Sequence, residues 1–187
     1  MNQFIFDFIK KGTAEFDISG KKYKLCRGKI QDSDALFEIQ EKLPLEIYIP
    51  SSMSELTAAA KNNELYVIKQ GNIFIAYMIM LMNGSKSSYA DFTDEKNFAV
   101  IDSVYVEKFF RGIHLQMLLL NLAEELARAN EISGLLATVS EQNKHSISNF
   151  INAGYVIVKN VNYNLSGELK PRLLVMKKLN PSDAPVP

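Results

Sequence analysis

The sequence has little of the chemistry that builds disulfides or metal centres. Its 187 residues include one cysteine, Cys26, two histidines and no tryptophan. A single cysteine cannot close an internal disulfide, and no CxxC or HExxH spacing is present, so neither a disulfide framework nor a metal site is expected. We interpret Cys26 as a core residue of a protein that works in a reducing, cytoplasmic setting.

Excess charge of either sign is also missing. The 21 Lys plus Arg residues balance 21 Asp plus Glu residues, and the pI is near 6.7. A nucleic-acid partner is disfavoured, since sequence-independent binding needs a basic surface. Runs of about 18 apolar residues, which a transmembrane helix requires, are absent as well, so no membrane partner is expected.

The N-terminus has only part of the pattern of a signal peptide. Asp7 interrupts its apolar run, a lysine pair follows the run instead of preceding it, and no AxA cleavage pattern comes after. We therefore interpret this segment as mature protein. Four apolar residues fall at helical spacing and predict a short helix packed on the domain, with membrane contact as the less favoured alternative: Phe4, Ile5, Phe8 and Ile9.

The remaining composition is that of one globular domain, with 47% hydrophobic and 22% charged residues. Strand patterns cover residues 14–18, 23–30, 65–69, 73–82, 98–106, 135–139, 155–164 and 173–179. Helical patterns cover residues 33–43, 54–61, 115–129 and 145–152, the first with Ser33 as its N-cap. Strands interleaved with single helices predict a mixed α/β sheet covered on both faces.

A basic turn joins the predicted strand at 98–106 to the helix at 115–129. The segment reads Val104-Tyr-Val-Glu-Lys-Phe-Phe-Arg-Gly-Ile-His-Leu-Gln-Met. A helix that starts after such a turn presents free backbone N–H groups and the positive end of its dipole, which favour a phosphate. Any strand, turn and helix with one Arg and one Gly presents such N–H groups, so the turn alone is a weak indication of a phosphate site.

A second segment, residues 138–155, strengthens the indication. It leaves a strand, enters a helix at an Asn and ends in Gly-Tyr. Together the two segments resemble the motifs of the GNAT (Gcn5-related) N-acetyltransferase superfamily, V-x-P-x-x-RGxGxG/A followed by N-x-x-[AS]-x-x-x-[YF]-x-x-x-G-[FY]. The second motif is matched by Asn143, Ser146, Phe150, Gly154 and Tyr155.

The resemblance covers roughly residues 22–179. It implies a GNAT-like mixed, mostly antiparallel central sheet of about seven strands with helices on both faces. Residues 22–179 would form the acyl-CoA-binding domain, residues 1–21 an N-terminal extension with the first hairpin strand, and residues 180–187, with their three prolines, a flexible tail.

The resemblance also implies acetyl-CoA, or another acyl-CoA, as co-substrate. The backbone of Val104, Tyr105 and Val106 would bind the pantetheine arm as if it were an added strand. Asn143 would contact the cofactor through its side chain, and Arg111, Lys108 or Lys144 would face phosphates, with simple solvation of these side chains as the alternative. The pyrophosphate would be held by backbone N–H groups of the turn and the helix start, namely Gly112, Ile113, His114, Leu115, Gln116 and Met117.

Two positions that the family fills with small residues are His114 and Gln116 here, and Lys108 replaces a proline. If the family's glycine is needed for a positive φ, His114 costs on the order of 1 kcal/mol. One hypothesis is that the side chains of His114 and Gln116 donate hydrogen bonds to the pyrophosphate. The alternative is a histidine that the loop merely tolerates.

The resemblance points to Asp102, nine residues before Arg111, as the base that accepts a proton from the attacking amine. A purely structural carboxylate at a strand end is the alternative. Phe150 stands where the family usually places a tyrosine acid, and its ring cannot donate a proton. Because a thiol has a pKa near 8.5, release of the thiolate without an acid costs only about 2 kcal/mol at pH 7.

These features predict an acyl-CoA-dependent N-acyltransferase that moves an acetyl group directly to an amine in a ternary complex. A non-catalytic acyl-CoA-binding or regulatory module is the alternative, and a structural domain that binds no CoA is a third. The acceptor would be a small-molecule or peptide amine selected by residues 33–63 and 83–97. In the resembled family, a homodimer paired through residues 155–179 would be ordinary.

Overall fold

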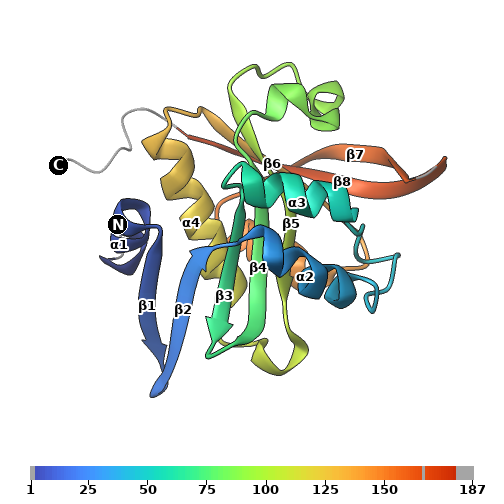
Figure 1. Ribbon diagram of the computed structural model, residues 1–187. Helices are drawn as coiled ribbons and strands as arrows, with labels where there is room; N and C mark the ends of the chain where they lie inside the picture. The colour runs from blue at the N-terminus through green and yellow to red at the C-terminus, as the bar shows by residue number, and fades with distance from the viewer. Residues whose placement is uncertain (1–2, 166, 180–187) are drawn as a thin grey trace.

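The computed structural model describes residues 3–165 and 167–179. Within them, eight strands form one sheet in the order β1-β2-β3-β4-β5-β6-β8-β7, and only the β5–β6 pair is parallel (Figure 1). The expected mixed, mostly antiparallel sheet is confirmed, with one strand more than the expected seven. The strands are β1 (Thr13–Ile18), β2 (Lys21–Arg27), β3 (Leu65–Gln70), β4 (Ile73–Leu81), β5 (Phe98–Val106), β6 (Gly134–Val139), β7 (Val156–Leu165) and β8 (Glu168–Lys178).

Helices cover both faces of this sheet. On one face, α1 (Gln3–Lys11), α4 (Leu115–Ala129) and α5 (Lys144–Asn152) contribute to the largest core cluster. On the other face, α2 (Ser33–Gln40) and α3 (Met53–Lys61) bury Leu36 and Leu56 against β3 and β4. Figure 1 shows α2 and α3 in front of the strands and α4 behind them. Each helix buries an apolar stripe, as the sequence periodicity predicts.

The N-terminal helix α1 is part of the main core. Ile5 and Phe8 are buried, while Phe4 and Ile9 pack against the same cluster at its margin. The four apolar residues thus share one face that packs on the domain, as expected. Within the described residues, no helix combines the length and the apolar character that crossing a membrane requires.

Several boundaries differ from the sequence-based expectation; β2, for example, covers Lys21–Arg27 instead of 23–30. Strand β8 begins at Glu168 instead of 173, because its first half pairs with β7 alone and Pro171, which has no N–H to donate, is tolerated where only one neighbour is present. Helix α2 ends at Gln40, and Asp32, not Ser33, precedes its first turn. The predicted tail, 180–187, lies outside the described residues.

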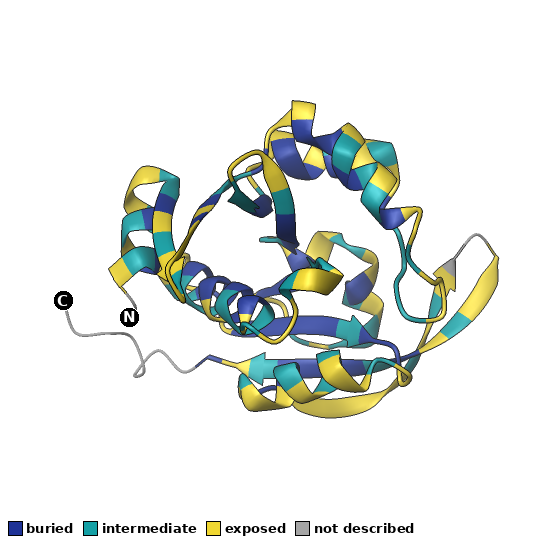
Figure 2. Cartoon of the chain, turned by 90° about the horizontal axis from the view of Figure 1, so that it is seen from below, coloured by how far each residue is buried: buried dark blue, intermediate teal, exposed yellow. Residues whose placement is uncertain are grey.

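Burial follows this layering. Viewed from below, buried residues concentrate where the helices face the strands, whereas the far end of the β7–β8 hairpin carries mostly exposed residues (Figure 2). A third cluster of buried residues lies under the segment 83–97 and includes Tyr89. This segment contains two short 3-10 turns, Gly84–Lys86 and Ser88–Phe92, where the sequence predicts only a loop.

Candidate active site

Strands β5 and β6 separate in the middle of the sheet. They pair from Phe98 with Gly134 up to Ile101 with Ala137, and no pairing continues beyond. From residue 102 to 106, β5 is therefore bonded on one side only, to β4. Val104, Tyr105 and Val106 lie on this open edge, which offers unpaired backbone groups to an extended ligand.

A β-bulge places Asp102 at the start of the open edge. Ile79 of β4 faces Ser103, whereas the next residue, Met80, faces Ile101, so Asp102 is the extra residue of β5. Bulges redirect the side chain of the inserted residue. Asp102 lines a cavity of about 810 Å³ whose walls come from residues 37–55, β5, β6, α5 and the β7–β8 hairpin.

The surroundings of Asp102 suit a general base. Burial, together with the negative charge of Glu55, raises the pKa of Asp102 to about 6, although hydrogen bonds with Ser103 and Tyr89 oppose the rise. The Ser103 hydroxyl donates to Oδ2 of Asp102 at 3.3 Å. No Lys or Arg of the described residues forms an ion pair with this carboxyl. At pH 7 Asp102 is ionised and still basic enough to take a proton.

The turn before α4 presents a row of free N–H groups. Gly112 has φ +85° and His114 has φ +62°, both in the left-handed region, and His114 is the N-cap of α4. Within residues 3–165 and 167–179, the N–H groups of Gly112, Ile113 and His114 make no hydrogen bond. The first-turn N–H groups of Leu115, Gln116 and Met117 have no partner inside the helix. Free N–H groups at a helix start can bind an anion such as a phosphate, and the binding of a pyrophosphate here stays a prediction.

The side chains around this turn point in different directions. His114 is exposed, and Nε of Arg111 donates to the carbonyl of Val106 at 3.2 Å. Gln116 is held by α5: its amide donates to the Ser146 hydroxyl at 3.0 Å and accepts from Asn149 at 2.7 Å. The hypothesised hydrogen bond from the Gln116 side chain to a phosphate is therefore not supported.

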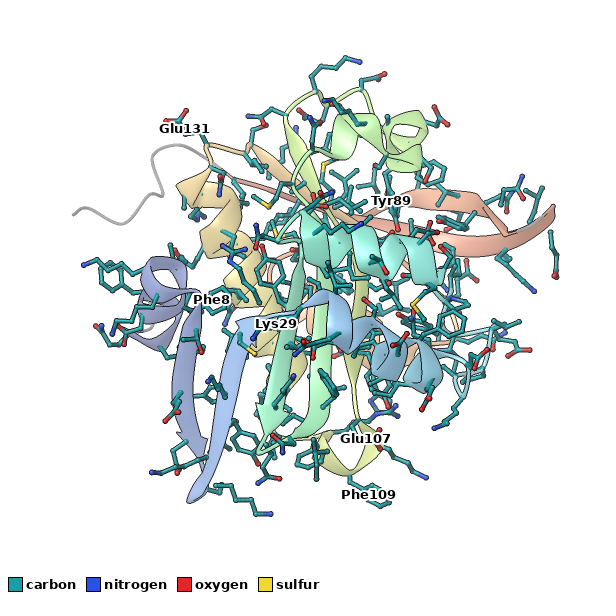
Figure 3. The ribbon with its side chains drawn as sticks, viewed as in Figure 1. Phe8, Lys29, Tyr89, Glu107, Phe109 and Glu131 are labelled. Atoms are coloured by element: carbon teal, nitrogen blue, oxygen red, sulfur yellow. The ribbon has the colours of Figure 1, made fainter. Side chains whose placement is uncertain are left out.

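This turn lies at one end of the sheet. Figure 3 shows Glu107 and Phe109 where the chain leaves β5 toward α4. Phe109 is 90% exposed, and the Glu107 carboxylate accepts a hydrogen bond of 2.6 Å from the Tyr105 hydroxyl. The strand that borders the cavity thus runs directly into the turn with the free N–H groups.

The second motif forms the start of α5 and one wall of the cavity. Asn143 is the N-cap of α5, and its Oδ1 accepts from the Ser146 N–H at 3.1 Å. Phe150 is buried in the cavity wall and meets Tyr155 edge-on, with ring centres 5.0 Å apart. Tyr155 and Ser148, whose hydroxyl groups lie near Phe150 in the chain, do not line the cavity.

Tyr48 and Arg172 are among the cavity residues that the sequence analysis does not single out, although Tyr48 lies within the range 33–63 expected to select the acceptor. Tyr48, from the segment between α2 and α3, shares a hydrogen bond of 2.5 Å with the Tyr77 hydroxyl, and burial raises its pKa to about 12. Arg172 enters from β8 and is only 8% exposed. Neither belongs to a motif, and both reach the cavity through contacts between distant segments, so no local signal could have found them.

Known proteins share the fold of this chain. The GNAT-family acetyltransferase of Listeria monocytogenes aligns with a TM-score of 0.65 at 14% identity, over 88% of this chain and 99% of its own. Arabidopsis thaliana NAA60, in complex with a bisubstrate analogue, aligns with a TM-score of 0.69 at 12% identity. The alignment covers 84% of this chain and 98% of NAA60. The structure of yncA from Salmonella typhimurium with acetyl-CoA aligns with a TM-score of 0.65 at 18% identity, and the alignment covers 88% of this chain and 98% of yncA.

Sequence comparison identifies the family. No curated protein matches the chain significantly. A sequence model described as the acetyltransferase (GNAT) family matches residues 33–155, which is more than half of the chain and includes both motif segments. The structural likeness, at these low identities, indicates the fold, and the sequence match indicates the relationship. The chain therefore belongs to the acetyltransferase (GNAT) family.

Proposed function

We propose that this protein is an N-acetyltransferase that moves an acetyl group from acetyl-CoA directly to an amine in a ternary complex. The observation that carries the proposal is the placement of Asp102. It lies in a bulge at the start of the open edge of β5, inside the cavity, with a pKa near 6. A base and an open strand edge thus face the same space.

The residues present fit acetyl-CoA. The open backbone of Val104, Tyr105 and Val106 would hold the pantetheine arm, and the N–H groups from Gly112 to Met117 would hold the pyrophosphate. Arg111 and Asn143 supply further polar groups near these two regions. When bound, acetyl-CoA supplies a thioester as the acyl donor.

The chain's own residues then act on the amine. Asp102 accepts the proton that the amine loses as its nitrogen forms a bond to the thioester carbon, and the carbon–sulfur bond breaks. Backbone N–H groups on the open edge of β5 stabilise the negative charge that develops on the carbonyl oxygen. Phe150 offers no proton, so the sulfur leaves as thiolate, which costs about 2 kcal/mol relative to the thiol at pH 7, and solvent then protonates it.

Titration with acetyl-CoA, CoA and dephospho-CoA tests the proposal, followed by a thiol-release assay with a panel of amines. At a hundredfold excess over Kd, acetyl-CoA should stabilise the fold by about 2.7 kcal/mol. For a chain of this size the melting midpoint should rise by roughly 5–10 °C. Amine-dependent release of thiol should accompany binding.

Two results would contradict this function in different ways. If none of the three ligands moves the midpoint, the free N–H groups of the turn do not bind pyrophosphate. If acetyl-CoA binds but no amine releases thiol, the non-catalytic module is the correct interpretation. Phe150 at the position of the family's acid is the observation that favours that second candidate.

A further inference from the structure

The buried side of the cavity contains a cation. Arg172 is the residue of β8 immediately before pairing with β6 begins at Leu173, so it stands beside the end of β6. Its guanidinium donates to the carbonyl of Ile47 at 3.2 Å and to the carbonyl of Thr138 at 3.5 Å. These contacts hold the charge in the cavity wall, and three of the five N–H donors of the guanidinium make no bond to any residue that the structure describes.

This cation lacks the partner that burial normally demands. No carboxylate in residues 3–165 and 167–179 forms an ion pair with Arg172, and its buried Nε has no hydrogen-bond partner there. Burial lowers the pKa of Arg172, which reflects the cost of desolvating the charge. A buried charge without a counter-ion is strongly unfavourable, so a ligand that supplies the negative charge gains affinity.

The groups around Arg172 do not neutralise it. Three tyrosines line the cavity and lie within electrostatic range of both Arg172 and Asp102: Tyr48, Tyr89 and Tyr163. Burial raises the pKa of each, so they remain neutral phenols that do not balance the charge of Arg172. Tyr89, labelled in Figure 3, comes from the turn Ser88–Phe92.

One cavity thus holds a cation and a base with opposite charges. We propose that the acceptor is a small primary amine that carries a carboxylate, which Arg172 binds while the amine faces Asp102. This inference rests on the proposed acetyl transfer. A planar carboxylate with one negative charge matches two N–H groups of one guanidinium, whereas a phosphate would bring more charge than a single arginine balances.

The test compares acids with their own amides on the wild-type protein. The panel contains the L-amino acids, β-alanine and γ-aminobutyrate, each beside its carboxamide, with acetyl-CoA as donor and thiol release as readout. A charge-assisted hydrogen bond to the carboxylate predicts that kcat/KM for the accepted acid exceeds that for its amide by about 10- to 100-fold. This ratio needs no variant, so it does not depend on how a mutant folds.

The variant Arg172→Gln should bring the ratio close to one, and Arg172→Lys should keep part of it. Lys159→Gln, on the exposed surface of β7, serves as the control and should leave the ratio unchanged. If Arg172 only holds the chain together, Arg172→Gln lowers kcat/KM for acid and amide alike. That result, or a wild-type ratio at or below one, would overturn the inference.

The failure of the inference and the failure of the proposed function have different signatures. Acetyl-CoA binding together with acetylation of uncharged amines, but not of the acids, removes the carboxylate class and leaves the transferase intact. Absence of acetyl-CoA binding, or of transfer to every amine, removes both.

Discussion

At the residue scale, Asp102 combines two properties that oppose each other. Its burial raises its pKa to about 6, which makes it a better base, but the same burial disfavours the ionised form that the base needs. Because the folded-state pKa lies above the unfolded value of about 3.9, the neutral form is the one that stabilises the fold. This stability is present below pH 4 and is lost as the pH rises through 6.

We expect Asp102→Asn to abolish most of the transfer and to stabilise the protein. Above pH 7 the variant should be more stable by about 1–3 kcal/mol, because it removes a buried negative charge. In the wild type, kcat/KM should rise with pH around 6 as Asp102 ionises, and this limb should vanish in the variant. Stopped-time thiol release from pH 5 to 8 and thermal melts at pH 5 and 8 measure both effects.

Glu38→Gln provides the control, since this carboxyl is exposed on α2. This variant should change neither the rise of kcat/KM with pH around 6 nor the melting midpoint. An Asp102→Asn variant with wild-type kcat/KM would remove Asp102 as the base and leave it a structural residue.

The resemblance to the family indicates Asp102 as the candidate base but does not indicate the surroundings of this residue. Asp102 was predicted from its distance to Arg111, yet its place in a bulge depends on how β4 pairs with β5. His114 was predicted to be strained if its φ were positive, and its φ is +62°. Whether a residue adopts that conformation is decided by the turn as a whole, so the sequence could state only the condition.

At the scale of elements, helices α4 and α5 are joined by one side chain. Gln116 lies in the first turn of α4 and bonds Ser146 and Asn149 of α5. The family motif has a small residue at this position, so the sequence suggested a contact to phosphate. The structure instead connects the two segments that form the two sides of the candidate CoA site.

We expect Gln116→Ala to destabilise the protein by about 1–3 kcal/mol, because two hydrogen bonds between the helices are lost. The affinity for acetyl-CoA should stay within about threefold of wild type, since the backbone N–H of residue 116 remains in place. Asn121→Ala, exposed on the same helix, should leave stability nearly unchanged. Calorimetry and thermal melts on the two variants measure these changes.

A large loss of acetyl-CoA affinity in Gln116→Ala at unchanged stability would show the opposite: that the side chain acts on the phosphate. A structural role of the Gln116 side chain therefore lowers the stability, whereas a contact to phosphate lowers the affinity for acetyl-CoA.

At the scale of the whole molecule, the N-terminal extension belongs to the same core as the acyltransferase fold. Phe8 of α1 is fully buried and meets Tyr66 of β3 with ring centres 5.9 Å apart. The guanidinium of Arg27 lies over both rings. The family match begins only at residue 33. Even so, β1 adds an edge strand to the sheet, and α1 packs into the main core cluster.

We expect Phe8→Ala to lower the stability of the entire protein by about 3–5 kcal/mol, as for other buried aromatic residues. Phe6→Ala is the matched control, since Phe6 on the same helix is 42% exposed and should cost less than about 1 kcal/mol. Denaturant unfolding followed by far-UV circular dichroism compares the two. An unchanged midpoint for Phe8→Ala would make α1 an independent appendage.

The sequence by itself determined the elements and their order, the two motif segments and the family. These features depend on local periodicity, as in α4, or on residues close in the chain, as from Asn143 to Tyr155. Boundaries were wrong where pairing between distant segments decided them, as for β8.

The tertiary structure alone decided what surrounds the candidate site. Contacts between segments far apart in the chain decide four features of this site. These are the bulge at Asp102, the opening between β5 and β6, the side-chain direction of Gln116 and the position of Arg172 in the cavity wall. Such contacts are set by register and packing over the whole sheet. A single sequence gives no local signal for them, because each residue's own type is compatible with several partners.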